Sequence, residues 1–152
     1  MSVNIEKQSD DQPRNLVTWQ DAELLAAGHM RTLGFTDADL TESGADGGID
    51  VQSRHAAAQV KFHATPTGAP EIQKLRGAAY DFDHQIFYSA GGYTPAAIAF
   101  AERAEVALFI IGPWSSIAAA NAAAEKLLGG EIEREGGSGT PLPPMLLTLG
   151  LR

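Results

Sequence analysis

The sequence predicts one α/β domain in which a mixed central sheet is flanked by helices. Two short apolar runs, 85–89 and 106–111, have the composition of buried strands. Segments with helical periodicity precede and follow these runs, as in parallel strands joined by helices. Two alternating segments, 49–53 and 58–63, are typical of an antiparallel hairpin, which would make the sheet mixed.

The composition excludes several classes of protein. The chain has 152 residues, of which 44% are hydrophobic and 20% are charged, as expected for one globular domain. It has no cysteine, which excludes a disulfide scaffold, a thiolate metal site and a cysteine nucleophile. No apolar run approaches membrane-spanning length and the N-terminus carries no apolar signal core, so we expect a cytoplasmic protein.

Composition also divides the chain into four parts. We expect a disordered lead at 1–15, the folded domain at 16–128, a flexible linker rich in Gly, Glu and Pro at 129–144, and an apolar tail at 145–152. The tail has two interpretations. It is either a strand or extended arm that packs on the core, or a peptide that docks on a partner protein or a second copy of the chain.

The first helix is expected to begin at Thr18, which can cap it, and to end at Gly34. At 100° per residue, one apolar stripe contains Trp19, Ala22, Ala26, Met30 and Leu33. A short strand at 35–41 and a glycine-rich turn at 44–48 follow. Both tryptophans of the chain, Trp19 and Trp114, are expected in the core or between helices rather than as platforms for base stacking.

Three more helices are expected after the hairpin. The first starts at Pro70 and runs to about residue 80, burying Ile72, Leu75 and Ala79. The second is capped by Thr94 and ends near residue 103. The third is an alanine-rich helix from residue 114 or 115 to residue 128.

The charge is unevenly distributed. The formal net charge is −8, and residues 1–50 hold three basic and ten acidic side chains. Residues 51–80 hold four basic side chains and one acidic side chain, so this stretch is where an anion would be attracted. The overall sign excludes a protein that coats DNA non-specifically with high affinity.

Common catalytic signatures are missing from the sequence. There is no G-x-x-x-x-G-K-[ST] phosphate loop, no G-x-G-x-x-G and no G-x-S-x-G elbow. The four histidines have no i, i+4 pair that would make a zinc helix. What remains is the pair of segments G-A-D-G-G-I-D-V at 44–51 and A-A-A-Q-V-K-F-H at 56–63.

Strand alternation is expected to bring three polar side chains of these segments together. It places Asp50 on the face opposite Ile49 and Val51, and it places Gln59 and Lys61 on one common face. If the apolar faces of the two segments pack together, then Asp50, Gln59 and Lys61 converge on the polar side.

This grouping is suited to metal-assisted phosphodiester hydrolysis. Mg²⁺ prefers hard oxygen ligands, which Asp50, the side-chain oxygen of Gln59 and the main-chain carbonyl of Val60 would supply. Lys61 would hold the attacking water and offset charge in the transition state.

Glu23 has two interpretations. It lies near the apolar stripe of the first helix, where an unpaired carboxylate is costly, so it is either a ligand of the metal or an ion-pair partner of Lys61. Alternatively, Glu23 sits at the edge of the stripe and is solvated.

These motifs together resemble the Mrr-type catalytic domain of the PD-(D/E)xK restriction-endonuclease-like superfamily, in its Q-x-K variant. The segment S-A-G-G-Y-T-P-A-A-I-A-F-A at 89–101 resembles the distal strand-turn-helix of that family, and the resemblance covers about residues 18–112. By position, Asp50 matches the motif aspartate, Gln59 and Lys61 match the Q-x-K pair, and Glu23 matches the helix glutamate. The resemblance implies a restriction-endonuclease-like three-layer sandwich and Mg²⁺-dependent DNA cleavage, with Mn²⁺ able to substitute.

The expected function is therefore a Mg²⁺-dependent DNA endonuclease in restriction, defence or DNA processing. Double-strand cleavage by a subunit with one site requires two copies, so a homodimer is expected. Four side chains are candidates for phosphate contacts: Arg54, His63, Lys74 and Arg76. The alternatives are a catalytically silent module of the same fold that binds DNA or a partner protein, and an RNase or toxin-like effector with the same metal chemistry.

Overall fold

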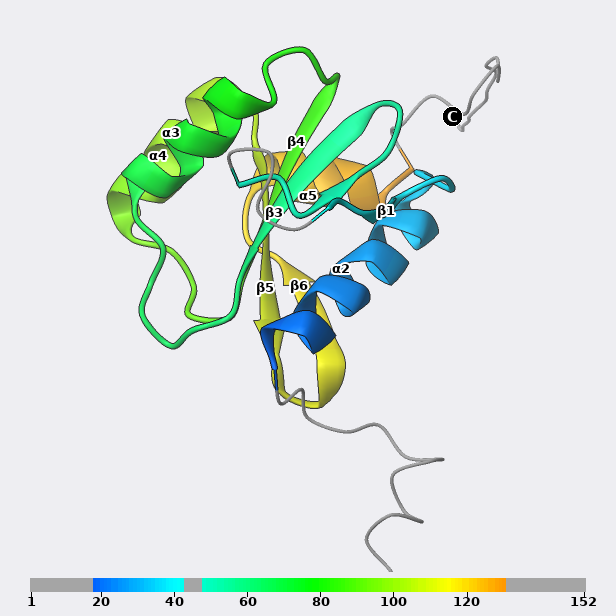
Figure 1. Cartoon of the computed structure of the whole chain (residues 1–152). Coiled ribbons are helices and arrows are strands. Elements are labelled where there is room, and N and C mark those ends of the chain that lie inside the picture. The colour runs from blue at the N-terminus through cyan, green and yellow to red at the C-terminus, as the bar shows by residue number, and fades with distance from the viewer. Residues whose placement is uncertain (1–17, 43–47, 131–152) are drawn as a thin grey trace, which may run out of the picture.

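The computed structural model describes residues 18–42 and 48–130, which form a six-stranded sheet with helices on both faces (Figure 1). The strands lie in the sheet in chain order: β1 (Asp39–Leu40), β2 (Val51–Gln52), β3 (Ala56–Lys61), β4 (His84–Ser89), β5 (Ala107–Gly112) and β6 (Ser116–Ala119). The central strands β3, β4 and β5 are parallel, whereas the pairs β1–β2, β2–β3 and β5–β6 are antiparallel. The predicted α/β fold with a mixed sheet is confirmed.

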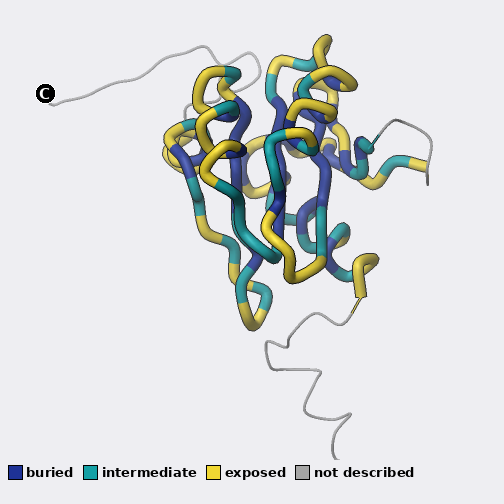
Figure 2. Tube along the Cα trace, turned by 90° about the vertical axis from the view of Figure 1, so that its left-hand side faces the viewer, coloured by how far each residue is buried: buried dark blue, intermediate teal, exposed yellow. Residues whose placement is uncertain are grey.

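The sheet separates two buried clusters, and helices cover each of them. The helices are α2 (Trp19–Leu33), α3 (Ala69–Ala78), α4 (Pro95–Ala104), the short 3-10 helix η1 (Pro113–Ser115) and α5 (Ala122–Leu128). One buried cluster joins α2 and α5 to one face of the sheet, and a second joins α3 and α4 to the other face. Figure 2 shows the buried strands enclosed between the partly exposed helices. This is the three-layer sandwich that the sequence predicts.

Helix α2 begins and ends where the sequence predicts. The Thr18 hydroxyl accepts a hydrogen bond from the main-chain nitrogen of Asp21 at 3.1 Å, and the Asp21 carboxylate accepts from the main-chain nitrogen of Thr18 at 3.1 Å. Gly34 ends the helix in the left-handed conformation, with φ 120°. The predicted stripe is buried except for Trp19, which is 55% exposed, so its predicted place in the core is wrong.

Small side chains bring α2 close to β3. Ala22 and Ala26 of the helix and Ala56 and Ala58 of the strand are fully buried in one cluster. Alanines on both surfaces allow the two backbones to approach closely without a cavity. This contact fixes the first turns of α2, which carry Glu23, next to the end of β3.

The hairpin of β2 and β3 is confirmed, but two details of the prediction are wrong. The expected strand at 35–41 shortens to β1, because Phe35 and Ala38 bury their side chains from a loop instead. Ile49 and Val51 do not share a face. Val51 packs in the cluster under α2, whereas Ile49, which precedes β2, packs in the cluster under α3 and α4.

The predicted alanine-rich helix from residue 114 or 115 is also wrong, because its first part forms the edge strand β6. Ser116–Ala119 pair with β5, and η1 makes the turn between the two strands. Asn121 then separates strand from helix, since its side-chain oxygen accepts hydrogen bonds at 3.0 Å from the main-chain nitrogens of Leu108 and Ala124. Packing of the strand on β5 overrides the helix propensity of alanine.

The loops that follow β3 and β4 are tied together. The main-chain nitrogen of Thr67 donates to the carbonyl of Gly92 at 2.9 Å, and the nitrogen of Thr94 donates to the carbonyl of Thr67 at 3.0 Å. The Thr67 hydroxyl also lies 3.0 Å from that of Ser89. These contacts hold both loops at the carboxyl end of the parallel strands.

Some predictions concern residues outside the described ranges. They are the lead at 1–15, most of the glycine-rich turn with Asp46, the linker beyond residue 130 and the tail at 145–152. In the part of the chain that the structure describes, none of the helices has the length and hydropathy needed to cross a membrane.

Candidate active site

Asp50 lies just before β2, where the hairpin of β2 and β3 opens. Its main-chain nitrogen donates to the carbonyl of Ala58 at 2.8 Å, and its carbonyl accepts from the nitrogen of Thr41 at 3.0 Å. Its side-chain Oδ2 accepts from the main-chain nitrogen of Val60 at 2.8 Å. The carboxylate oxygen therefore takes the place of the main-chain carbonyl that a neighbouring strand would offer to the Val60 N–H. This hydrogen bond fixes the carboxylate at the edge of β3.

The main-chain carbonyl of Val60 faces the same edge. The N–H and C=O of one strand residue point in the same direction, and this direction alternates along the strand. The Val60 N–H points to Asp50, whereas the carbonyl of Lys61 accepts from the nitrogen of Ala90 on the β4 side at 3.0 Å. The alternation therefore directs the Val60 oxygen to the side of β3 on which the Asp50 carboxylate lies.

Lys61 is the last residue of β3, and its side chain turns toward α3. Its Nζ lies 3.7 Å from Oε1 of Glu71, in the first turn of that helix, and both side chains are partly exposed. Sequence reasoning gave Glu71 no role in the site. The sequence did offer one signal. Glu71 is an acidic residue directly after Pro70, which marks the first turn of the helix that follows β3.

Gln59 is packed against the glycine-rich segment that leads to Asp50. Its side chain is only 8% exposed. A Cβ at Gly48 would lie 3.2 Å from both Oε1 and Nε2 of Gln59, and Gly48 has φ +100°. The backbone conformation at position 48 therefore favours glycine, and a Cβ there would also press on the Gln59 amide.

Glu23 reaches the site from α2. Burial raises the pKa of Glu23 above its ordinary value, and the nearby carboxylate of Asp50 raises it further. The Asp50 charge thus acts on Glu23 directly, whereas the ion pair of Lys61 is made with Glu71. The structure therefore favours placing Glu23 beside Asp50 over the interpretation that it pairs with Lys61.

The pKa of Asp50 is also raised, because burial disfavours its charged form. The hydrogen bond from Val60 and the ammonium of Lys61 act in the opposite direction and lower the pKa, but they do not cancel the effect of burial. Two neighbouring carboxylates thus have raised pKa values. A cation bound between them would relieve both the burial cost and the mutual repulsion.

The donors at this edge fit a hard divalent cation. The Asp50 and Glu23 carboxylates, the Val60 carbonyl and the Gln59 amide all offer oxygen, which Mg²⁺ prefers. Among residues 18–42 and 48–130, no group of three or more His, Asp or Glu side chains could hold a metal ion. A cation here would therefore need main-chain or amide oxygens and water besides the carboxylates, as is common for Mg²⁺.

A family model described as restriction endonuclease (Mrr_cat) matches residues 15–111, from the start of α2 almost to the end of β5. The chain belongs to this Mrr-type family. The match includes Glu23, Asp50, Gln59 and Lys61. Searches among curated proteins and among solved structures gave no match.

Membership of the Mrr-type family makes this a nuclease-type domain that binds DNA, and the predicted phosphate contacts can be placed on it. His63 is exposed in the loop that follows Lys61, and its Nδ1 lies 3.2 Å from the carbonyl oxygen of Thr65. Lys74 is exposed and Arg76 half-buried on α3. Of these side chains, His63 is the one that follows the candidate site directly along the chain.

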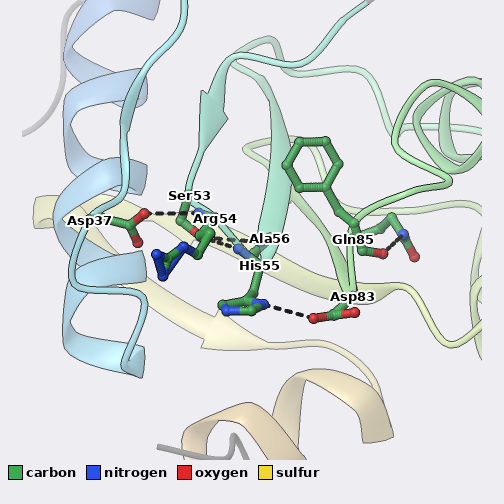
Figure 3. A network of polar contacts seen from close by, with 8 residues as sticks. Asp37, Ser53, Arg54, His55, Ala56, Asp83 and Gln85 are labelled. Carbon is green, nitrogen blue, oxygen red and sulfur yellow. Dashed lines mark hydrogen bonds and ion pairs between the residues drawn. The ribbon is translucent and has the colours of Figure 1, made fainter. Parts of the chain in front are cut away.

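Arg54 lies at the other end of β3. It belongs to the turn that precedes this strand, where its main-chain nitrogen donates to Oδ2 of Asp37 at 2.9 Å (Figure 3). Beside it, Nδ1 of His55 lies 2.8 Å from Oδ2 of Asp83. The length of β3 separates this turn from Lys61, so Arg54 is not among the residues around the candidate active site of this Mrr-type domain.

Proposed function

We propose that this chain is a Mg²⁺-dependent DNA endonuclease that hydrolyses phosphodiester bonds in restriction, defence or DNA processing. One observation carries the proposal. The Asp50 carboxylate is fixed at the edge of β3 by the main-chain N–H of Val60, the residue before Lys61. Its charge also raises the pKa of Glu23 on α2. Two carboxylates and an ammonium group thus converge at the end of the strand.

The residues proposed to hold the metal are Asp50, Gln59 through its side-chain oxygen, and Val60 through its main-chain carbonyl, with Glu23 as a further carboxylate. A divalent cation bound there would supply positive charge to the oxygens of the scissile phosphate. Mn²⁺ accepts the same oxygen donors and is expected to substitute.

Lys61 is proposed to act on the attacking water and on the transition state. Its ammonium group has three N–H donors, so it can orient the water oxygen toward phosphorus and donate to a phosphate oxygen. The water oxygen then forms a bond to phosphorus as one P–O ester bond breaks, while the water gives up a proton to solvent and the leaving oxygen takes a proton from solvent. The Glu71 carboxylate lies 3.7 Å from Nζ as a partly exposed, weak ion pair.

The residues that the structure describes hold one such site, so cleavage of both strands would require a second copy. We therefore propose a homodimer on double-stranded substrates. The C-terminal tail at 145–152 remains a proposed contact for a partner protein.

A plasmid assay tests the proposal. Supercoiled plasmid is incubated with the full chain and Mg²⁺, Mn²⁺ or EDTA, and nicked and linear products are quantified. We expect nicking with either metal and none with EDTA. We expect Lys61→Ala to lose at least about 10²-fold in rate, the usual effect of removing one transition-state donor.

Lys126→Ala is the matched control, because Lys126 is an exposed lysine on α5. It should cleave like the wild type. If no metal supports cleavage while the folded protein still retards DNA in a gel, the silent binding module would replace the endonuclease.

A further inference from the structure

Both tryptophans of the chain lie on its surface. Trp19 is 55% exposed and Trp114 is 59% exposed, although tryptophan is usually well buried. An exposed tryptophan offers a large apolar ring with one N–H donor, and tryptophan is enriched at binding interfaces for this reason. The positions of Trp19 and Trp114 relative to the candidate active site therefore indicate what they bind.

Trp19 lies one helical turn from the site. It is the first residue of α2, and residues four apart lie on the same face of a helix, so Trp19 and Glu23 share a face. Glu23 is close enough to Asp50 for that charge to raise its pKa. The backbone of Trp19 is thus about 6 Å from that of Glu23 along the helix axis, on the side of the N-terminus of α2.

Trp114 lies in the turn of the β5–β6 hairpin, beyond the end of the sheet at which β3 ends with Lys61. Lys61 is in register with Ser89, and Ser89 with Ile110. The end of β5 at Gly112 is therefore about 7 Å beyond Lys61 along the strand direction, and Trp114 follows it. The start of α2 and the turn of this hairpin lie at the same end of the molecule (Figure 1).

The backbone at Trp114 is strained. Trp114 has φ 57° and Ser115 has φ 62°, the left-handed region that residues with a Cβ rarely adopt. The main-chain nitrogen of Ser116 donates to the carbonyl of Pro113, which closes a tight turn of the kind that usually contains Asn-Gly. This turn fixes the position of Trp114 at the tip of the β5–β6 hairpin, where its side chain is 59% exposed.

The charge of the chain favours bases over phosphates as the main contact. The formal net charge is −8, so phosphate attraction alone cannot supply strong binding. Stacking of a base on an aromatic ring does not depend on the sign of the protein charge. The bases of an intact duplex are already stacked, so they are not available for such contacts.

We propose that Trp19 and Trp114 stack on unpaired bases that flank the scissile phosphate, and that the substrate is DNA with a single-stranded segment at the cleavage site. This inference rests on the proposed nuclease function and adds its substrate class. The two rings lie on two separate elements, α2 and the β5–β6 hairpin, that project beyond the end of the sheet at which the carboxylates gather. A strand crossing this end would thus meet a ring from each element.

The two tryptophans also supply the test, because all tryptophan fluorescence of the chain comes from them. The full chain is titrated with oligothymidine in EDTA, so that cleavage does not occur. We expect quenching of the fluorescence, and a clearly weaker response to a duplex of the same length. Trp19→Phe and Trp114→Phe each leave one reporter and show whether both rings respond.

Binding is then measured by anisotropy of a labelled oligothymidine. Trp19→Ala and Trp114→Ala should each weaken binding on the order of 5- to 150-fold, the usual range for losing one base–aromatic stack. Tyr80→Ala is the matched control, since Tyr80 is 74% exposed and lies beyond the C-terminal end of α3. Thermal unfolding verifies that each variant is folded.

Three results would overturn the inference: absence of quenching, duplex binding as tight as single-strand binding, or wild-type affinity of both alanine variants. Tighter binding of oligouridine than of oligothymidine would overturn the assignment to DNA. Lys61→Ala separates the two proposals, because it should keep the quenching and lose the cleavage. Quenching without cleavage by the wild type would contradict the nuclease alone, and cleavage without quenching would contradict the base contacts alone.

Discussion

The Asp50 carboxylate accepts the main-chain N–H of Val60 at 2.8 Å. One side chain therefore completes the hydrogen bonding of β3 and at the same time supplies the best-placed charge for a cation. Because β2 is only two residues long, a ladder partner cannot take this position. Substitutions of Asp50 thus affect stability and chemistry together unless the replacement keeps an acceptor oxygen.

Asp50→Asn keeps an acceptor for Val60 and removes the charge. We expect it to fold, to lose at least about 10²-fold in cleavage rate, and to lose the rise in melting temperature that Mg²⁺ gives the wild type. Asp50→Ala should cost a further 1–3 kcal/mol or so, because a partly buried N–H is left without its acceptor. Plasmid nicking and thermal unfolding with and without Mg²⁺ measure these effects. Wild-type cleavage by Asp50→Asn would refute the metal role of this residue.

The ion pair of Lys61 and Glu71 should contribute little to stability. Its atoms are 3.7 Å apart and both side chains are partly exposed, so solvent screens the pair. Lys61→Ala and Glu71→Gln should each change the free energy of unfolding by less than about 1 kcal/mol, measured by urea denaturation. If the stability is unchanged, a loss of cleavage in Lys61→Ala is due to the missing ammonium group and not to unfolding. A destabilisation of several kcal/mol would instead mean that Lys61 is part of the fold.

Much of the fold could be predicted because local signals agree with tertiary packing. Thr18, Gly34 and Thr94 cap helices as their residue types indicate, and the apolar runs form buried parallel strands. The prediction failed at residues 114–121, where alanine favours a helix in isolation. Pairing of β6 with β5 and the hydrogen bonds of Asn121 to Leu108 and Val106 are long-range, so composition does not reveal them. The cap that Asn121 makes on α5 is a local signal, which the prediction missed.

The candidate site was predicted in part for a similar reason. The motif identifies Asp50, Gln59 and Lys61, since they lie close together in the sequence. Strand alternation alone misplaced Ile49 relative to Val51, because the chain has not yet entered β2 at Ile49. The sequence identifies Glu71 as an acidic residue of a first helical turn, but its pairing with Lys61 could be found only once α3 was placed against the end of β3.

Gly91 is required for the contact between the loops that follow β3 and β4. A Cβ at this position would overlap the carbonyl oxygen of Thr65 and lie 2.6 Å from that of Ala64, and both are backbone atoms. Gly91→Ala should therefore lower the free energy of unfolding by about 1–3 kcal/mol. Gly28→Ala is the control. It lies within α2 with nothing within 4 Å of the added Cβ, and it should stabilise the protein by about 0.5–1 kcal/mol. Equal urea midpoints for the two variants would contradict the close approach.

Half-buried histidines should make stability depend on pH. Burial lowers the pKa of His29, whose Nδ1 lies 2.8 Å from the hydroxyl of Tyr88, and it also lowers the pKa of His84. Below the ordinary value of 6.5, the unfolded chain binds protons at these positions that the folded chain does not bind. The free energy of unfolding should therefore fall as the pH decreases from 6.5 toward the folded-state pKa values, and this contribution should be constant above 6.5.

Urea denaturation at pH 7.5, 6.5 and 5.5 measures this slope. His29→Gln removes one of the two groups and should flatten the slope. The variant is compared with the wild type at each pH, so that the carboxylates, which titrate in both proteins, cancel. If His29→Gln keeps the full slope, proton uptake on unfolding comes from elsewhere, and burial does not hold the His29 imidazole in its neutral form.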